Sequence, residues 1–317
     1  MSRFINPFTD FGFKRLFGQK DHKRILLGFL NALFEGEFVI KDLTYHDKEQ
    51  LGLTREHRCV IYDIYCTLAD GSHVIVEMQN KRESNFDARA LYYASNAIVS
   101  QGQKGSAWRF EYAPVIGVYF LNFRQEELGK AFRSDFSITK TIETFAHTHK
   151  QQAIVLPSPP KTSEPIAREA PQADVSEKTQ PQGTTKSPFA DKLRMVFLQL
   201  PEFTLEEDEC RTDLEKWTFI MIHMEQLQSI PWAAQDELYA ELSKVSNLAA
   251  LTPKERAIYD ETLRQYRDNL ACLDAAFADG EKNKAIAVAR GMLSDGLPVE
   301  VISKYTGLTQ QEIEALK

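Results

Sequence analysis

Three polar side chains interrupt two otherwise apolar segments of this 317-residue chain. They are Asp63 within residues 60–68, and Glu77 and Gln79 within residues 73–79. A carboxylate in an apolar strand is costly unless a partner offsets its charge. A divalent cation is one such partner, because hard cations prefer carboxylate oxygens. The residue types therefore indicate a metal site, and the alternative is the exposed polar face of an edge hairpin.

The turn between the two segments decides whether the carboxylates can meet. An Asp-Gly dipeptide at residues 70–71, between two β-rich segments, predicts a hairpin. A two-residue loop would set Asp63 opposite Met78 and place the carboxylates on opposite faces. A three-residue loop over residues 69–71 would instead set Asp63 opposite Glu77, on the same face. The metal-site hypothesis requires the three-residue loop, or a bulge that restores its register.

The segments around the hairpin alternate between helical and strand-like patterns, which predicts an α/β fold with a mixed central sheet flanked by helices. Residues 114–123 are almost continuously apolar, as in a strand that is buried on both faces. Asp10 or Thr9 is expected to cap the first helix. We expect the other helices at residues 23–34 and 86–103, and the other strands at residues 39–45, 58–79, 132–145 and 192–200.

A proline-rich segment at residues 148–188 separates two parts of the chain and holds seven of its thirteen prolines. It lacks apolar periodicity, so we expect a disordered insertion. Residues 1–147 would form the first part of the core, residues 189–203 its returning strand, and residues 204–317 an all-α C-terminal region. Within that region we expect helices at residues 218–227, 233–248, 253–277, 281–293 and 298–305, and a last helix with a Thr309–Glu312 capping box.

The composition is that of a soluble globular protein, with 43% hydrophobic and 26% charged residues. No apolar segment approaches the length that crosses a membrane, and the N-terminal residues lack the apolar region of a signal peptide. The four cysteines are scattered without metal-ligand spacing, which favours a cytoplasmic protein. A net charge of −7 excludes a uniformly basic nucleic-acid binder, although residues 1–150 carry a slight positive balance.

An Asp, a hairpin and then Glu-x-Gln together resemble the core of the PD-(D/E)xK nucleases, with Gln in the usual Lys position. More narrowly, the chain resembles the recombination-promoting nuclease family of bacteria, also described as transposases. The resemblance covers most of residues 1–145 and 190–317. It rests on the order and spacing of four segments, at residues 6–18, 25–33, 89–93 and 307–316.

This resemblance implies a PD-(D/E)xK-like fold and a Mg²⁺-dependent (or Mn²⁺-dependent) DNA endonuclease linked to recombination, mobile elements or phage defence. Asp63 and Glu77 would bind the metal, and Gln79 would orient the attacking water. A Gln amide can orient water but carries no positive charge, which puts turnover in question. Asp10 is either an additional metal ligand or only a helix cap.

Four further residues are candidates for contact with DNA. Lys14 lies on the first helix, and Lys81 shares a strand face with Gln79 if that strand continues. Arg89 and Tyr93 lie one helical turn apart and could contact a phosphate. The alternatives are solvated surface charge for the two lysines and helix-on-sheet packing for Tyr93.

Two readings compete with a DNA-cutting enzyme. The chain could be a catalytically inactive module that binds nucleic acid or protein on a nuclease scaffold, or a regulator whose insertion recruits a partner. Its last helices resemble a helix-turn-helix, but Glu312 and Glu314 make the second helix acidic, which favours packing or homo-oligomerisation through the helical C-terminal region over groove binding.

Overall fold

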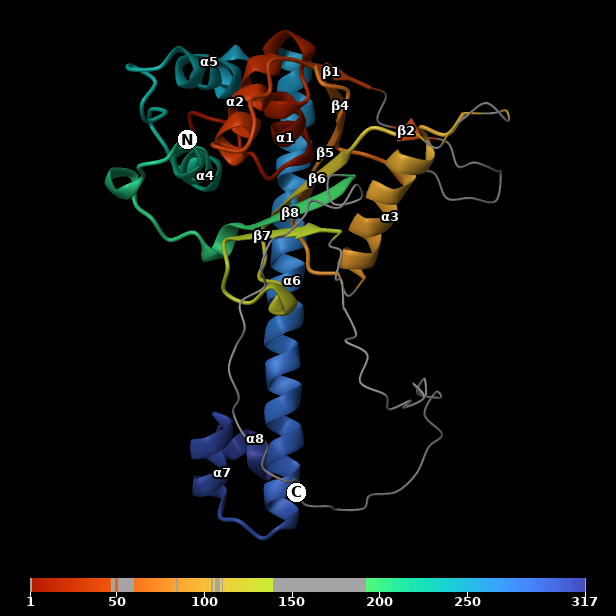
Figure 1. Ribbon diagram of the computed structural model, residues 1–317. Helices are drawn as coiled ribbons and strands as arrows, with labels where there is room; N and C mark the ends of the chain where they lie inside the picture. The colour runs from red at the N-terminus through yellow and green to blue at the C-terminus, as the bar shows by residue number, and fades with distance from the viewer. Residues whose placement is uncertain are drawn as a thin grey trace, which may run out of the picture.

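A computed structural model of the chain describes residues 2–46, 49–50, 60–83, 85–103, 105, 109, 111–138 and 192–316. It contains a lobe built around a β-sheet and a long helix that carries a small C-terminal helical unit at its far end (Figure 1). The predicted insertion at residues 148–188 lies outside the described residues.

The sheet of the main lobe has six strands in the order β1-β4-β5-β6-β8-β7. The pairs β5–β6 and β6–β8 are parallel and the other pairs are antiparallel, which confirms the predicted mixed sheet. A separate antiparallel pair is formed by β2 and β3. The strands are β1 (Leu43–Tyr45), β2 (Glu49–Gln50), β3 (Val60–Ile61), β4 (Ile64–Leu68), β5 (His73–Gln79), β6 (Val115–Leu121), β7 (Arg133–Ser137) and β8 (Leu193–Gln199).

Strand β6 is at the centre of the core, and all seven of its residues are buried. This confirms the expectation for a continuously apolar strand. Strand β1 is shorter than the predicted segment 39–45. The backbone N–H and C=O of Ile40 bind the side chain of Asn31 at 2.7 and 3.0 Å, which replaces the sheet hydrogen bonds that residue 40 would otherwise need.

Helices cover both faces of the sheet. One face packs against α1 (Asp10–Phe17), α2 (Lys23–Leu33), α4 (Asp213–His223) and α5 (Glu237–Ser246), and the other packs against α3 (Phe86–Val99) (Figure 1). The first layer is aromatic at its centre, where the rings of Phe13, Phe17 and Phe29 surround Phe120 of β6 at centroid distances of 4.9–6.0 Å. This packing fixes α1 and α2 against the middle of the sheet.

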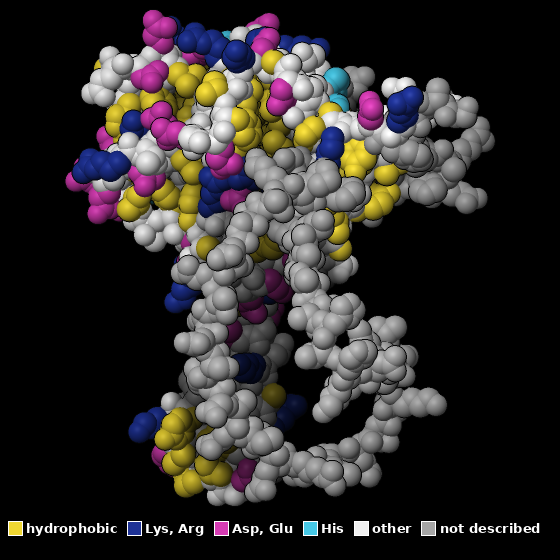
Figure 2. Space-filling view, in the orientation of Figure 1, with side chains coloured by type: hydrophobic (Ala, Val, Ile, Leu, Met, Phe, Trp, Pro, Cys, Tyr) yellow, Lys and Arg dark blue, Asp and Glu magenta, His cyan; other side chains and the backbone are white. Residues whose placement is uncertain are grey.

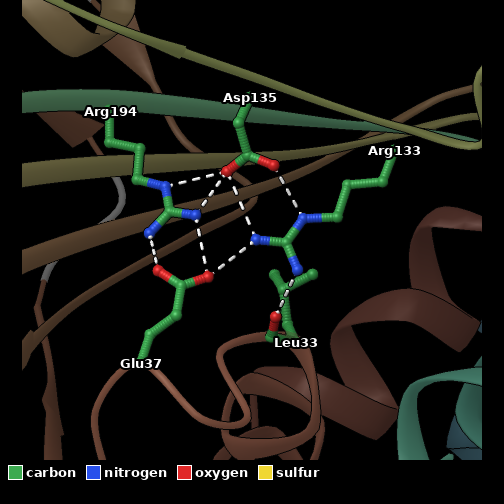
Figure 3. Close-up of polar contacts among 5 residues, drawn as sticks. All are labelled: Leu33, Glu37, Arg133, Asp135 and Arg194. Atoms are coloured by element: carbon green, nitrogen blue, oxygen red, sulfur yellow. Dashed lines mark hydrogen bonds and ion pairs between the residues drawn. The ribbon is translucent and has the colours of Figure 1, made fainter. Parts of the chain in front are cut away.

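Four charged side chains join the sheet edge to the end of α2 (Figure 3). Asp135 of β7 binds both Arg133 and Arg194, and Glu37 binds the same two guanidinium groups. Arg133 also donates a hydrogen bond to the carbonyl of Leu33, at 2.7 Å. Because β7 and β8 are antiparallel neighbours, the chain between residues 138 and 192 connects two adjacent strands.

The predicted helices at residues 253–277 and 281–293 form one continuous helix, α6 (Pro253–Ser294). The break expected between them does not occur. Gly280 lies inside this helix, where a glycine costs only about 1 kcal/mol relative to alanine, and the neighbouring alanines favour helix on both sides. Further along, α7 (Val299–Thr306) ends at Gly307, whose φ of 69° is left-handed, and α8 (Gln310–Glu314) begins with the expected capping box.

Helix α6 has two different halves. Its first half packs on the main lobe through Tyr259, whose hydroxyl accepts a 2.9 Å hydrogen bond from the Asn6 amide. Its second half packs against α7 and α8, where Ala289, Ile302 and Ile313 are buried. Between these contacts charged side chains lie along the helix (Figure 2). None of the described helices is long and apolar enough to cross a membrane.

Candidate active site

The hairpin turn has the three-residue loop that the metal-site hypothesis requires. The amide of Leu68 donates to the carbonyl of Ser72 at 2.8 Å, so these two residues close the loop formed by residues 69–71. Gly71 has a φ of 90°, a conformation that glycine adopts without strain. The amide of Gly71 donates to the carbonyl of Leu68, which tightens the turn.

This turn brings Asp63 opposite Glu77. Strand β4 pairs with β5 in a register that sets Ile64 against Val76, and the next pair outward in the same register is Asp63 and Glu77. The structure therefore has the register that the metal-site hypothesis requires. Glu77 is 4% exposed, whereas Asp63 lies just outside β4 and is half-buried.

Two hydrogen bonds tie the carboxylates to the opposite strand. The amide of Asp63 donates to Oε1 of Glu77 at 3.0 Å, and the amide of Met78 donates to Oδ2 of Asp63 at 3.1 Å. Each carboxylate thus accepts a backbone N–H from across the hairpin. Both acidic side chains are held between the ends of β4 and β5, where the strand ladder has just stopped.

Burial, and after it the negative charge of Asp63, raise the pKa of Glu77 to about 8. The hydrogen bond from the Asp63 amide and the charges of Arg89 and Lys14 act in the opposite sense but do not compensate. A divalent cation bound between two neighbouring acidic groups would offset the repulsion between them and the cost of burying one of them as a carboxylate. The residues present therefore fit a metal with oxygen ligands.

The protein ligands would be few. Within the described ranges no group of three or more His, Cys, Asp or Glu side chains is placed to hold a metal ion. Two carboxylates are nevertheless sufficient for Mg²⁺, which usually keeps several waters and takes one or two carboxylates together with substrate phosphate. Such a pair leaves coordination positions for substrate.

Gln79 is held by an arginine on α3. Its Oε1 accepts a hydrogen bond from Nη2 of Arg89, and Nη1 of Arg89 binds the Glu83 carboxylate, both at 2.5 Å. Arg89 also lies 5.6 Å from the centroid of the Phe86 ring. The amide oxygen of Gln79 is thereby occupied, and its Nε2 group remains as a hydrogen-bond donor. Arg89 thus lies beside the site, as the sequence suggested, but in contact with Gln79.

Asp10 and Lys14 form an ion pair one turn apart on α1. The helix is capped by Thr9, whose hydroxyl accepts the Gly12 amide at 2.9 Å, so Asp10 is not the cap. Lys14 is close enough to Glu77 for its charge to lower the pKa of that carboxyl. The pair therefore lies near the two site carboxylates, and a metal-binding role for Asp10 stays a prediction.

Lys81 and Tyr93 are placed differently from the other candidates. Strand β5 ends at Gln79, so Lys81 does not continue its face. Its ammonium group instead donates to Oδ1 of Asn269 on α6, at 2.8 Å. The ring of Tyr93 packs edge-on against Tyr62 with centroids 5.7 Å apart, which agrees with the alternative of helix-on-sheet packing.

The sequence analysis missed Tyr119 of β6, which pairs in register with Glu77. Its hydroxyl donates to the carbonyl of Ala90 at 3.0 Å and fixes α3 over the sheet. Burial, and then the neighbouring charge of Glu77, raise the pKa of Tyr119. Knowledge that β5 pairs with β6 would have identified Tyr119 as a neighbour of Glu77. That pairing is a tertiary contact between distant segments, which no local sequence pattern reports.

Comparison with known families agrees with this arrangement. A family profile described as "PD-(D/E)XK nuclease family transposase" matches residues 7–161 and 174–276. The chain belongs to this family. A second profile, "Rpn/YhgA-like nuclease family, C-terminal HTH domain", matches residues 282–317, so the expected resemblance is confirmed over both parts. No curated protein and no solved structure matches the chain.

The helix-turn-helix unit of this PD-(D/E)XK protein consists of the end of α6 with α7 and α8. Lys282 of α6 binds Glu312 of α8 at 3.1 Å. The side chain of Glu312 also accepts the Thr309 amide, and together these contacts lower its pKa to about 2. Glu312 is one of the two acidic residues that argue against DNA-groove binding by the last helix, and its carboxylate thus makes contacts within the unit itself.

Proposed function

We propose that the chain is a divalent-metal-dependent DNA endonuclease that hydrolyses phosphodiester bonds at the Asp63–Glu77 pair. The observation that carries this proposal is the opposed pair of carboxylates at one end of a hairpin, one of them buried with its pKa raised to about 8. Membership of the PD-(D/E)XK nuclease family supports the same chemistry.

Asp63 and Glu77 would hold Mg²⁺ or Mn²⁺, with Asp10 as a further candidate from α1. When bound, such an ion supplies positive charge for activating water and for stabilising the phosphate in the transition state. The protein contributes by orienting both carboxylates. Their hydrogen bonds to the backbone amides of Asp63 and Met78 restrict the two side chains before any ion or substrate arrives.

Gln79 would orient the attacking water through its Nε2 group. Because Arg89 binds the amide oxygen, the amide cannot rotate without losing a charge-assisted hydrogen bond. Arg89 also brings the positive charge that a glutamine lacks, although one side chain away from the position of the usual lysine. Gln79 would thus orient the water and Arg89 would supply the positive charge, which are the two functions of the usual lysine.

DNA is the proposed substrate and partner. The C-terminal helix-turn-helix domain supports this, since such domains commonly bind DNA. Lys14, Lys81, Arg89 and Tyr93 stay candidates for contact with the backbone. The links to recombination, mobile elements or phage defence, the cytoplasmic location and a homo-oligomer through the C-terminal helices all remain predictions.

The alternative is a binding module without catalysis, and the glutamine at position 79 is the observation that favours it. An experiment with two charge-removing variants separates the two proposals. Asp63→Asn and Glu77→Gln keep an oxygen to accept the Met78 and Asp63 amides, so both are expected to fold.

Supercoiled plasmid incubated with the full chain and Mg²⁺ or Mn²⁺ should be nicked by the wild type and by neither variant. The matched control Glu127→Gln, on the exposed surface, should nick like the wild type. A wild-type protein that binds the plasmid but cuts it with neither metal would establish the binding module instead.

A further inference from the structure

A small pocket shares Asp10 and Lys81 with the candidate site residues but does not include the Asp63–Glu77 pair. The pocket has a volume of about 180 Å³ and forms where the end of β5, the start of α1 and the middle of α6 meet. Its lining includes Phe8, Asp10, Asn80, Lys81, Tyr266 and Asn269. We refer to it as the end-of-sheet pocket.

Two connections place the end-of-sheet pocket next to the carboxylate pair. Asn80 of the pocket directly follows Gln79 of the site in the chain. The Asn80 side chain also donates to the carbonyl of Phe8, which ties this end of β5 to the residues just before α1. A nucleic-acid strand that places a phosphate at the carboxylate pair and passes around the end of β5 would bring a neighbouring nucleotide to the pocket, which Asn80 lines from the other face of the strand.

The polar groups of the pocket are held in fixed orientations by one another. Asn80 donates to the carbonyl of Phe8 at 2.7 Å, and Asn122 donates to the Asn80 side chain at 3.3 Å and to the Tyr266 hydroxyl at 3.2 Å. These contacts join segments that are far apart in the sequence. They make the pocket a preformed structure, in which little side-chain entropy remains to be lost when a ligand binds.

Several hydrogen-bonding groups remain for a ligand after these contacts are made. Lys81 uses one of its three N–H groups on Oδ1 of Asn269, which leaves the Asn269 amide nitrogen as a donor. The Tyr266 hydroxyl accepts from Asn122 and retains its own hydrogen. Asp10, at the start of α1, presents carboxylate oxygens as acceptors. The pocket therefore offers donors and acceptors together.

Two of the residues that line the pocket, Phe8 and Tyr266, are aromatic. The rings of Phe8 and Tyr266 lie 6.5 Å apart between centroids and are within 26° of parallel. Aromatic faces with amide and hydroxyl groups at their edges are the chemistry by which proteins hold unpaired bases, which stack on a ring and bond through the base edge. A phosphate group could bind the ammonium group of Lys81, but it offers only acceptors and would leave the Asp10 carboxylate without a donor from the ligand.

The size of the pocket limits the ligand further. At about 180 Å³ it is smaller than the ~300–1,000 Å³ sites that enclose drug-sized molecules. A single base can enter such a space, whereas a base pair cannot. We propose that the end-of-sheet pocket binds one unpaired nucleobase next to the scissile phosphate, so that the protein selects DNA with an unpaired nucleotide at the cleavage position.

This inference rests on the proposed function for its ligand, but binding can be measured without cleavage. The full-length Asp63→Asn protein would be titrated with two fluorescein-labelled hairpin DNAs, one fully paired and one with a single unpaired nucleotide in the stem. Fluorescence anisotropy should show tighter binding to the second DNA by about tenfold, the effect of one stacked base.

Asn269→Leu in this background should remove the difference between the two DNAs, because it replaces the amide by an apolar group of similar size. Gln235→Leu is the matched control, since Gln235 is exposed and lies outside both the pocket and the helix-turn-helix unit, and it should preserve the difference. If Asn269→Leu does not fold, Lys81→Met at an exposed position should give the same loss.

Equal binding of the two DNAs by the Asp63→Asn protein, or a preference that survives in the pocket variants, would overturn the inference. Either result leaves plasmid nicking by the wild type unaffected. Conversely, a wild-type protein that never nicks DNA but prefers the unpaired nucleotide would refute the endonuclease and retain the pocket.

Discussion

Replacement of Glu77 by glutamine should stabilise the metal-free protein, and more so as the pH rises. The carboxyl has an ordinary pKa of 4.5 and a raised pKa of about 8 in the folded chain. Its protonated form therefore stabilises the fold fully below pH 4.5, and this contribution is lost as the pH rises toward 8. A rise of that size corresponds to about 5 kcal/mol of unfolding free energy.

The assay is thermal unfolding in EDTA, followed by circular dichroism at several pH values between 5 and 8.5. At pH 5 the wild type and Glu77→Gln should melt at nearly the same temperature, because the wild-type carboxyl is protonated. At pH 8.5 the variant should melt higher by on the order of 10 °C. Glu127→Gln, on the exposed surface, should follow the wild type at every pH.

A divalent metal ion should reverse the order of the two melting temperatures. Mn²⁺ at pH 8.5 should raise the melting temperature of the wild type, because an ion that binds only the folded state stabilises it, and should have little effect on Glu77→Gln. Melting curves of the two proteins that change in parallel with pH in EDTA would refute the reasoning, because Glu77 would then ionise as easily in the folded chain as in the unfolded chain.

Three further outcomes follow from other contacts. Arg89→Met should lower kcat for nicking by about tenfold or more with little change in KM, because Gln79 loses the contact that fixes its amide. Adding Gln79→Lys to the Arg89→Met protein should restore part of kcat, because the lysine ammonium group needs no partner to fix its orientation. Arg194→Met should reduce stability in urea by only about 1–2 kcal/mol, since its ion pairs are partly exposed. Gly71→Val should cost about 1–3 kcal/mol because of the positive φ, and Gly71→Asn should cost less in the same urea titration.

The parts of the site that the sequence could predict are those with local causes. The Asp-Gly turn and the alternation along two short strands reduced the register to two alternatives, and one of them sets Asp63 opposite Glu77, because a hairpin register depends only on the loop between its strands. The continuously apolar segment of β6 likewise identified a strand buried on both faces.

The parts that the sequence could not predict depend on contacts between distant segments. The bond from Asn122 to Tyr266 joins residues 144 positions apart, and that from Lys81 to Asn269 joins residues 188 apart. No local pattern reports such neighbours. For the same reason the sequence did not show that the guanidinium group of Arg89 contacts Gln79.

The continuous α6 helix was missed for a different reason. The predicted helices stopped at residue 277 and resumed at residue 281, on either side of Gly280, and a glycine often ends a helix when its φ is positive. Gly280 has no positive φ and costs the helix only a modest amount. Gly307, which has a φ of 69°, does end a helix where the sequence indicated.

The central claim is that Asp63 and Glu77 share one divalent cation, and anomalous diffraction from crystals soaked in Mn²⁺ tests it most directly. The account predicts one anomalous peak between the two carboxylates, with an oxygen of each in the coordination sphere. A Mn²⁺-soaked crystal with no peak at this pair, or with a peak bound by neither carboxylate, would contradict it.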